Sequence, residues 1–365
     1  MMQSEDKLCV VVLFGGMSSE HEVSRVSAGT FVDNLDRARY EVLTVGITRE
    51  GRWLCTEATS AQMADGSWEE LPGNMPCVIS PDRADHGMIL FTPSGQVEKL
   101  HVDVVIPALH GLWGEDGTVQ GLLELAGIPY VGCGVLASAV CMDKAVANAL
   151  FEANGVPHTR WLAADRWEIE SDLEGVCEGV EKKLGWPVFV KPANAGSSVG
   201  ISKVSSRDEL KKAIDLALEN DRKVVFEAFV DGQEVECAVI GSDPAVATRP
   251  GEILAGAEFY TYDDKYKNGV SRTLIPANLS EEKLEEVRRN AEAAYRALGC
   301  QGLSRCDFFV EKGTGRVLCN ELNTLPGFTA ISMYPKLMES AGLDLPTLCL
   351  RLVKLAMERK GPYHG

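Results

Sequence analysis

The stretch SRCDFFVEKGTGRVLCNELN, residues 304–323, predicts a β-hairpin with one apolar face and one polar face. If residues 313–315 form a three-residue loop, the strands on either side pair in a fixed register. Because successive side chains of a strand point to opposite faces, the polar side chains gather on one face as two facing pairs, Asp307 with Glu321 and Arg305 with Asn323. The opposite face would be a core surface made of Cys306, Phe308, Val310, Leu318 and Leu322, with Asn320 as its only polar member.

The polar face of this hairpin is suited to a hard metal ion. Two carboxylates held side by side repel each other unless a cation lies near them. Oxygen ligands from Asp, Glu and Asn, without His or Cys, favour Mg²⁺, which completes its shell with water and phosphate oxygens. A solvated sheet face on which Arg305 bridges the carboxylates would explain the same residues. The loop Asn323–Gly327, which follows directly, favours the functional interpretation because functional residues concentrate on loops.

A second segment, KPANAGSSVG at residues 191–200, lies between two predicted strands and favours the binding of an anion. Its glycines let the backbone bend, so that free amides and the hydroxyls of Ser197 and Ser198 can point to one place. Lys191 would add a positive charge for phosphate groups. A flexible hairpin connection without a ligand is the alternative, since short Gly/Ser turns are common.

The N-terminal third alternates predicted strands and helices. The continuous apolar run Leu8–Phe14 indicates a strand buried on both faces, and Val102–Ile106 indicates a second buried strand of a doubly wound α/β sheet. The first run leads into the loop GGMSSEHE and the second into HGLWGEDG. Ligands of such sheets bind at the carboxyl ends of the strands. Glu20 and Glu115 could therefore hold an ammonium group there, or each could be a helix cap or turn residue.

The length of 365 residues predicts two or three domains at roughly 150 residues each. We expect an N-terminal α/β domain over residues 1–140, a central α+β unit over 141–230 and a C-terminal unit over 231–365. The irregular, turn-rich segment Gly51–Gly95 predicts a peripheral insertion with one or two weak strands. The polar stretch Tyr260–Asn278 has the composition of a long loop.

Composition excludes several classes of protein. With 53 acidic and 36 basic residues, the formal net charge is -17, and no segment is dense in Lys or Arg, so we expect no binding to nucleic acid. The same balance disfavours an anionic membrane surface, and no apolar run approaches the ~20 residues of a membrane span. The eleven cysteines are scattered, and the start of the chain is polar and acidic. These features predict a protein of the reducing cytoplasm.

Seven motifs give the sequence a recognisable likeness. It resembles the D-alanine–D-alanine ligase family of the ATP-grasp superfamily, whose ordered motifs are matched here by GGMSSEHEVS, HGLWGEDGTVQG, MDK, KPANAGSSVG, DDKY, SRCDFFV and NELNTLPGFTAISMYP. The resemblance covers about residues 8–355 and is weakest between residues 51 and 95. It implies a mixed α/β and α+β architecture, in which a doubly wound N-terminal substrate-binding domain precedes the two subdomains of an ATP-grasp fold. The C-terminal subdomain would carry the metal site and a lid loop.

The resemblance implies that ATP binds between the central and C-terminal units. The residues that would contact ATP are Lys144, Lys191 and Ser198 at its phosphates, Glu227, Phe229 and Val230 around the adenine, Glu234 at the ribose, and Asn320. Asp307, Glu321 and Asn323 would bind two Mg²⁺ ions, or Mn²⁺ in their place.

The family reaction would join two D-alanine molecules through an acylphosphate. Glu20 would hold the ammonium of the first D-alanine, with His110 nearby, and its carboxylate would attack the γ-phosphate of ATP. The amine of the second D-alanine would then attack the acylphosphate. The remaining implied contacts are Arg305 and the Gly327 N–H at the oxyanion, Ser332, Met333 and Lys265 at the second substrate, and a lid residue, Tyr266, bonded through Ser197 to Glu20.

The acceptor is the second substrate, whose amine or hydroxyl attacks the acylphosphate, and family members differ in which acceptor they use. Lys265-Tyr266 together with Ser332-Met333 fit the dipeptide-forming enzyme of peptidoglycan precursor synthesis, whereas relatives that use D-lactate or D-serine differ at these places. A ligase for D-lactate or D-serine is the first alternative, and a catalytically inactive nucleotide-binding module is the second. Asn194-Ala195 replaces a more polar pair found in some family members. The family is often dimeric, so a homodimer is among the expected assemblies.

Overall fold

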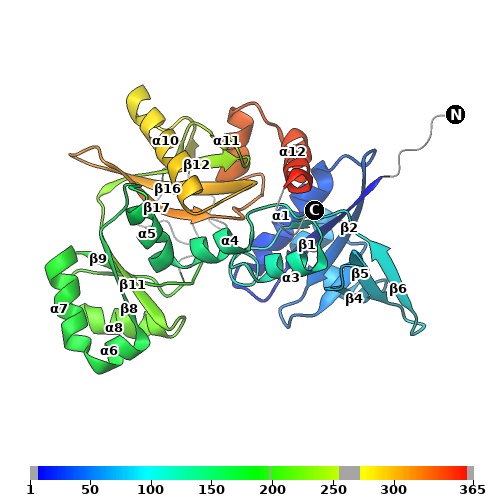
Figure 1. The fold of residues 1–365 in the computed structure, drawn as a ribbon, viewed down its shortest axis with the longest axis horizontal. Helices are drawn as coiled ribbons and strands as arrows, with labels where there is room; N and C mark the ends of the chain where they lie inside the picture. The colour runs from blue at the N-terminus through cyan, green and yellow to red at the C-terminus, as the bar shows by residue number, and fades with distance from the viewer. Residues whose placement is uncertain (1–6, 197–198, 255–271, 360–365) are drawn as a thin grey trace.

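A computed structural model describes residues 7–196, 199–254 and 272–359 of the chain. Three β-sheets follow one another along the sequence, and helices pack on their faces (Figure 1). The N-terminal sheet has seven strands, the central sheet four and the C-terminal sheet six. All eleven cysteines are free thiols. No helix in the described residues combines the length and the apolarity needed to cross a lipid bilayer.

The N-terminal sheet is built around its first strand. Its strands are β1 (Leu8–Gly15), β2 (Tyr40–Ile47), β3 (Trp53–Thr56), β4 (Met75–Ile79), β5 (Gly87–Phe91), β6 (Val97–His101) and β7 (Val104–Pro107), and its helices are α1 (His21–Asn34), α2 (Ser60–Asp65), the 3-10 helix η1 (Ser67–Glu70) and α3 (Thr118–Ala126). β1 pairs in parallel with β2 and with β7. Val12 packs in one core with Phe31 of α1, and Leu13 packs in another with Leu123 of α3. The predicted strand buried on both faces is confirmed.

The prediction of a peripheral insertion between Gly51 and Gly95 is wrong. β3, β4 and β5 lie in this segment and continue the sheet in the order β2-β3-β4-β5-β6. Met63 and Trp68 from the same segment are 0% exposed, and the Trp68 ring meets the Phe14 ring edge-on at 4.8 Å between centroids. These strands are short and separated by turns, so their own residue pattern predicts them weakly. Their place in the sheet depends mainly on pairing with the neighbouring strands, starting from β2.

The central sheet has the antiparallel order β10-β9-β11-β8. Its strands are β8 (Trp161–Asp165), β9 (Val188–Pro192), β10 (Ser202–Val204) and β11 (Lys223–Ala228); its helices are α6 (Arg166–Ser171), α7 (Leu173–Leu184) and α8 (Arg207–Leu218), and α4 (Val135–Met142) and α5 (Lys144–Ala153) precede it. Val188 and Val190 pack beneath the helices. The alternate residues Phe189 and Lys191 point to the other face, which lines a cavity.

The C-terminal sheet has β16 at its centre, antiparallel to β12 on one side and β17 on the other. Its strands are β12 (Gly232–Ile240), β13 (Val246–Ala247), β14 (Gly251–Leu254), β15 (Arg272–Leu274), β16 (Leu303–Glu311) and β17 (Val317–Asn323), and its helices are α10 (Glu281–Ala297), α11 (Met333–Ser340) and α12 (Leu345–Glu358). α10 packs on one face of this sheet through Leu284, Val287 and Ala291. The opposite face carries the polar residues predicted from the hairpin.

β16 and β17 form the predicted hairpin, and both predicted pairs of polar residues face each other. The connecting loop has four residues, 312–315, rather than three, because Glu311 N–H donates to the Arg316 carbonyl. A β-bulge compensates for the extra residue, so Phe308 pairs with Cys319. The prediction that Leu318 and Asn320 share the core face with Phe308 is therefore wrong. Cys319 packs in that core, and Asn320 lines the cavity.

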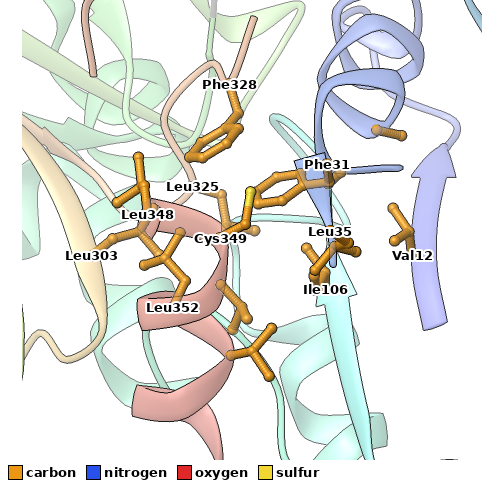
Figure 2. Packing of buried hydrophobic residues seen from close by; sticks show 14 of the residues in the cluster. Val12, Phe31, Leu35, Ile106, Leu303, Leu325, Phe328, Leu348, Cys349 and Leu352 are labelled. Atoms are coloured by element: carbon orange, nitrogen blue, oxygen red, sulfur yellow. The ribbon is translucent and has the colours of Figure 1, made fainter. Parts of the chain in front are cut away.

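The C-terminal helices pack against the N-terminal unit. Leu348, Cys349 and Leu352 of α12 share a core with Val12, Phe31 and Ile106, and Figure 2 shows them between the two units. The Phe31 and Phe328 rings stack with centroids 4.0 Å apart and planes inclined by 12°. The first and last segments of the chain therefore fix each other, and the loop around Phe328 is held against α1, where Phe328 N–H donates to Ser27 Oγ at 3.2 Å.

Candidate active site

One cavity of about 1120 Å³ receives the faces and loops of all three units. Every predicted site residue that the structure describes lines it, namely Glu20, His110, Lys144, Lys191, Glu227, Phe229, Val230, Glu234, Arg305, Asp307, Asn320, Glu321, Asn323, Gly327, Ser332 and Met333. Ser197, Ser198, Lys265 and Tyr266 were also predicted to act here, and they lie outside the described residues. The cavity thus gathers residues more than 300 positions apart in the sequence, from Glu20 to Met333.

The polar face of the hairpin forms one wall of the cavity. Arg305 binds Asp307 through two hydrogen bonds, from Nε to Oδ1 at 2.7 Å and from Nη2 to Oδ2 at 2.6 Å. Asn323 donates from Nδ2 to the same Asp307 at 3.1 Å. Arg305 Nε also lies 2.9 Å from Oε2 of Glu236, on β12. Burial alone would lower the pKa of Arg305, but the charges of Asp307 and Glu236 outweigh it and raise that pKa well above its usual value.

The oxygen donors on this wall fit a hard cation that is shared with a ligand. Asp307, Glu321 and Asn323 lie at facing positions of β16 and β17, and the buried Oδ1 of Asn320 beside them has no hydrogen-bond partner. No group of three or more His, Cys, Asp and Glu side chains in the described chain forms a complete metal site. Two carboxylates and amide oxygens suit Mg²⁺, which takes its other ligands from water and phosphate.

Two lysines of the central unit occupy the opposite wall. Lys191 Nζ lies 2.5 Å from Oε2 of Glu227, and Asn148 donates to the other oxygen of Glu227 at 3.2 Å. Burial alone would lower the pKa of Lys191, but the charge of Glu227 and the hydrogen bond to it raise that pKa. Lys144 donates from Nζ to the Ala195 carbonyl at 2.7 Å, and burial lowers its pKa. Both positive groups thus face the carboxylates of the hairpin across the cavity.

Aromatic side chains form the apolar part of the same wall. The Phe189 and Phe229 rings lie 6.2 Å apart between centroids, inclined by 48°. Lys203 Nζ lies 4.0 Å from the centroid of the Phe229 ring, an attractive cation–π contact. Val230 continues this lining towards Glu234. Flat apolar surface next to two lysines suits a ligand with an aromatic base and phosphates.

Glu20 lies where three loops meet. It occupies the N-cap position of α1 and is 8% exposed. A Cβ atom added at Gly111 would lie 2.6 Å from its Oε2, and one added at Gly196 would lie 2.8 Å from the same atom. A Cβ at either position would displace the end of the Glu20 side chain, so glycine at 111 and 196 lets both loops approach this carboxylate where it lies. Ser197 and Ser198, which are also predicted site residues, follow Gly196 directly in the sequence.

His110 holds the loop that carries Gly327. Its Nδ1 bonds to the Leu325 carbonyl at 2.9 Å and its Nε2 to Ser27 Oγ at 2.8 Å, and Ser27 Oγ accepts from Phe328 N–H at 3.2 Å. Burial lowers the pKa of His110, and a neutral ring fits this chain, with Nδ1–H donating to the carbonyl and Nε2 accepting from the hydroxyl. Both ring nitrogens are thus engaged, so His110 positions the loop.

Glu115 ties the same loop to the N-terminal unit. Its Oε1 accepts from Leu325 N–H at 3.0 Å and its Oε2 from Gly111 N–H at 2.8 Å. Burial, followed by the negative charge of Glu20, raises the pKa of Glu115 to about 8. A carboxyl group in this position is therefore neutral over part of the physiological pH range, and it fastens the two loops without adding a charge.

The titration of Glu115 makes stability depend on pH. A pKa that rises from 4.5 in the unfolded chain to about 8 in the fold favours the protonated folded state. Its contribution is complete below pH 4.5 and is lost as the pH rises towards 8. We expect Glu115→Gln, which cannot ionise, to lose less stability than the parent between pH 5 and pH 8. Denaturant unfolding at several pH values measures this, and parallel curves for the two proteins would contradict the assignment.

Sequence reasoning missed Glu236 and Lys203, and it missed the positioning role of Ser27. Glu236 could have been found, because in GQEVECAVI it alternates with the apolar Val235 and Cys237 and so shares a strand face with the predicted Glu234. Lys203 lies on β10, three residues after Gly200 of the glycine loop, where only its place next to a predicted anion site could have drawn attention. Ser27 gives no signal, since small polar residues on a buried helix face are common.

Comparisons with known proteins agree with this geometry. Residues 9–133 match the family model for the D-ala D-ala ligase N-terminus, and residues 150–354 match that for the C-terminus. The D-alanine–D-alanine ligase of Acetivibrio thermocellus is 49% identical over 364 residues, covering 97% of each chain. That of Caldicellulosiruptor bescii is 46% identical over 353 residues, covering 97% of this chain and 96% of its own.

Solved structures show the same architecture. The VanG D-Ala:D-Ser ligase of Enterococcus faecalis superposes with a TM-score of 0.88 at 37% identity, covering 96% of this chain and 100% of its own. The D-alanine-D-alanine ligase of Coxiella burnetii superposes with a TM-score of 0.83 at 34% identity, covering 97% and 96%. The predicted fold class, an ATP-grasp fold behind an N-terminal α/β domain, is confirmed. The chain belongs to the D-alanine–D-alanine ligase family.

Proposed function

We propose that the chain joins two D-alanine molecules into D-alanyl-D-alanine for peptidoglycan precursor synthesis, with conversion of ATP to ADP and phosphate. The enzyme class follows from the family, whose members are ATP-dependent ligases that require a divalent metal. One observation carries the proposal: a single cavity holds the paired carboxylates with Arg305, two buried lysines, and Glu20. These are the groups that phosphoryl transfer to an amino acid needs.

The nucleotide would lie between the central and C-terminal sheets. Lys144 and Lys191 would contact its phosphates, with Ser198 of the glycine loop. The adenine would lie along Glu227, Phe229 and Val230, and the ribose would lie at Glu234. Asn320, which lines the same cavity, would also contact ATP. Asp307, Glu321 and Asn323 would hold two Mg²⁺ ions, for which Mn²⁺ can substitute. When bound, these ions neutralise charge on the phosphates during transfer.

The amino acids would lie between the nucleotide and the N-terminal loops. Glu20 would bind the ammonium of the first D-alanine and leave its carboxylate facing the γ-phosphate. Arg305 and the Gly327 N–H would donate to the oxygen that becomes negative when the second amine attacks, which is the geometry of an oxyanion hole. Ser332, Met333 and Lys265 would contact the second D-alanine, and Tyr266 would close the site through Ser197.

A second candidate differs only in the acceptor. The superposition with a protein named a D-Ala:D-Ser ligase at a TM-score of 0.88 favours D-serine as an alternative, and D-lactate is the other member of this group. Met333 is 6% exposed and packs in the core below the cavity. An apolar residue there suits a methyl side chain better than a hydroxymethyl group, because nothing at that position pairs with the hydroxyl.

The proposal predicts a specific substrate requirement. We expect phosphate release from ATP only when both D-alanine and Mg²⁺ are present, with D-alanyl-D-alanine as the main product. A mixture of D-alanine with D-serine or D-lactate, analysed by mass spectrometry, compares the three acceptors directly, and L-alanine is the control. Turnover with L-alanine but not with D-alanine would contradict the proposal. A dominant mixed product would establish the second candidate instead.

Three further features belong to the same proposal. We propose that the domains meet near residues 140 and 230, because each sheet lies within one of these ranges, although α4 crosses the first boundary and α12 packs on the N-terminal unit. We also propose a cytoplasmic location, which eleven free thiols favour. We also propose a homodimer, because proteins of this family are often dimeric.

A further inference from the structure

Glu236 is a buried carboxylate of the cavity to which the proposed reaction gives no part. It lies on β12 directly opposite Asp307 of β16, and it is 8% exposed. Its neighbours on the strand, Val235 and Cys237, point into the core behind the sheet. Burying a carboxylate is costly unless a positive group compensates for it. Arg305 is such a positive group, since its Nε lies 2.9 Å from Glu236 Oε2.

The strand register lets Arg305 reach both carboxylates. Arg305 pairs across the sheet with Ala238, whose side chain is a single methyl group. The guanidinium is therefore free to extend along the sheet towards Glu236 and Asp307, which face each other two positions away. Its side chain is 14% exposed, as is that of Asp307, and that of Glu236 is 10% exposed. All three groups are thus removed from most of the solvent, where their mutual interactions are strong.

Arg305 and the proposed metal compete for Asp307. The guanidinium now holds both oxygens of Asp307, at 2.7 Å and 2.6 Å. A metal bound by this carboxylate would have to take at least one oxygen from the guanidinium. Without another partner, Arg305 would then either oppose metal binding or leave its place. A second carboxylate removes this conflict. Glu236 lies 2.9 Å from Arg305 Nε, the same atom that donates to Asp307 Oδ1, so Arg305 can keep one negative partner when Asp307 turns to the metal.

We propose that Glu236 is a positioning residue that retains Arg305 in the cavity while Asp307 binds the metal. This inference rests on the proposed function for the role of Arg305, which donates to the developing oxyanion. Glu236 touches neither substrate nor metal, and it acts through Arg305. It sets how readily Asp307 is released and where the guanidinium remains afterwards. The residue thus links metal binding to the later step in which the peptide bond forms.

The test uses the full chain and compares Glu236→Gln with Glu236→Asp. Calorimetric titration with ADP, with and without Mg²⁺ and with no amino acid present, measures metal binding without turnover. For Glu236→Gln we expect the gain in ADP affinity caused by Mg²⁺ to fall about 5- to 20-fold, while ADP affinity without metal stays within about twofold, because each lost charge-assisted contact is worth ~1–2 kcal/mol. In steady-state kinetics, the fold decrease in kcat should be larger than the fold change in KM for D-alanine. Glu236→Asp, which keeps the charge, should recover part of both losses.

Two controls separate this role from simple loss of charge or of stability. Glu252→Gln removes a carboxylate from the neighbouring strand β14, outside the cavity lining, and should behave as the parent. In an Arg305→Ala background, Glu236→Gln should change the effect of Mg²⁺ by less than about twofold, because its partner is gone. An undiminished effect there would show that Glu236 acts on the metal through its charge alone and would overturn the inference.

The remaining outcomes are also decisive. If Glu236→Gln matches Glu252→Gln in the effect of Mg²⁺ and in kcat, Glu236 has no positioning role. If Glu236→Gln does not fold, the comparison passes to Glu236→Ala, which also removes the charge, and an unchanged effect of Mg²⁺ in that variant overturns the inference. Because the calorimetry needs no amino acid, dependence on Glu236 without ligation of D-alanine would contradict the proposed function and leave the coupling of Glu236, Arg305 and metal intact.

Discussion

Arg305→Ala is expected to lower kcat for dipeptide formation by about 100- to 1000-fold, the usual cost of removing an oxyanion donor. Arg305 binds Asp307 at two atoms and lies 2.9 Å from Glu236 on the polar wall of the hairpin. Its loss removes the donor and leaves Asp307 and Glu236 facing each other. The effect on KM for ATP should be small, since the lysines proposed to contact the phosphates belong to the central unit. Steady-state kinetics with each substrate varied in turn measures both parameters.

Metal linkage provides a second readout for the same variant. Because Arg305 competes with the proposed metal for Asp307, its removal should let Mg²⁺ with ADP raise the melting temperature more in Arg305→Ala than in the parent. Arg305→Lys is the matched variant, which keeps the charge but lacks the planar fork that binds Asp307 at two atoms. It should show an intermediate metal effect and still lose most of kcat. Parental kcat in Arg305→Ala would defeat the oxyanion role.

Lys191→Met is expected to lower the free energy of unfolding by about 3–5 kcal/mol, because it leaves a buried carboxylate without its cation. The Lys191 and Glu227 side chains are 11% and 4% exposed and lie 2.5 Å apart. Asn148 remains as one partner of Glu227 at 3.2 Å, so the lower part of this range is expected. The same change should reduce kcat/KM for ATP about 10- to 100-fold, which corresponds to one lost charge-assisted contact with phosphate.

A double variant separates the two effects. Lys191→Met combined with Glu227→Gln removes both charges, so most of the stability should return. The loss in kcat/KM for ATP should remain, because no charge faces the phosphates from this position. Chemical denaturation and steady-state kinetics on the parent, both single variants and the double variant complete the cycle. Recovery of ATP affinity together with stability would show that Lys191 serves only to neutralise Glu227.

The sequence was sufficient for the polar wall of the site. Alternation along two strands and one turn was enough to pair Asp307 with Glu321 and Arg305 with Asn323. The positions of Asn320 and Leu318 were missed, because a loop one residue longer and a bulge of one residue cancel each other. Hydrophobic alternation does not reveal such a pair of compensating irregularities. The longer loop shifts the strand register by one residue and the bulge shifts it back, so the register differs only in the stretch between the loop and the bulge.

Contacts between distant segments were beyond sequence reasoning. The residues between Gly51 and Gly95 look irregular, yet pairing with β2 draws them into the sheet. His110 was expected beside the first substrate, and the structure shows both of its ring nitrogens bonded to Leu325 and Ser27. Neither bond could be inferred from a motif, because each depends on where α12 and the loop before α11 pack. The lid residues Lys265 and Tyr266 stay predictions.

The core shared by α12 and the N-terminal sheet has a consequence for synthesis of the chain. Val12, Phe31 and Ile106 emerge from the ribosome more than 200 residues before Leu348 and Leu352. Domains of a nascent chain usually fold in order from the N-terminus. Here the first unit has an apolar face that stays uncovered until α12 has been made. Its assembly therefore waits for α12, and a ribosome that stops before that helix releases a product with exposed apolar surface, suited to chaperone capture.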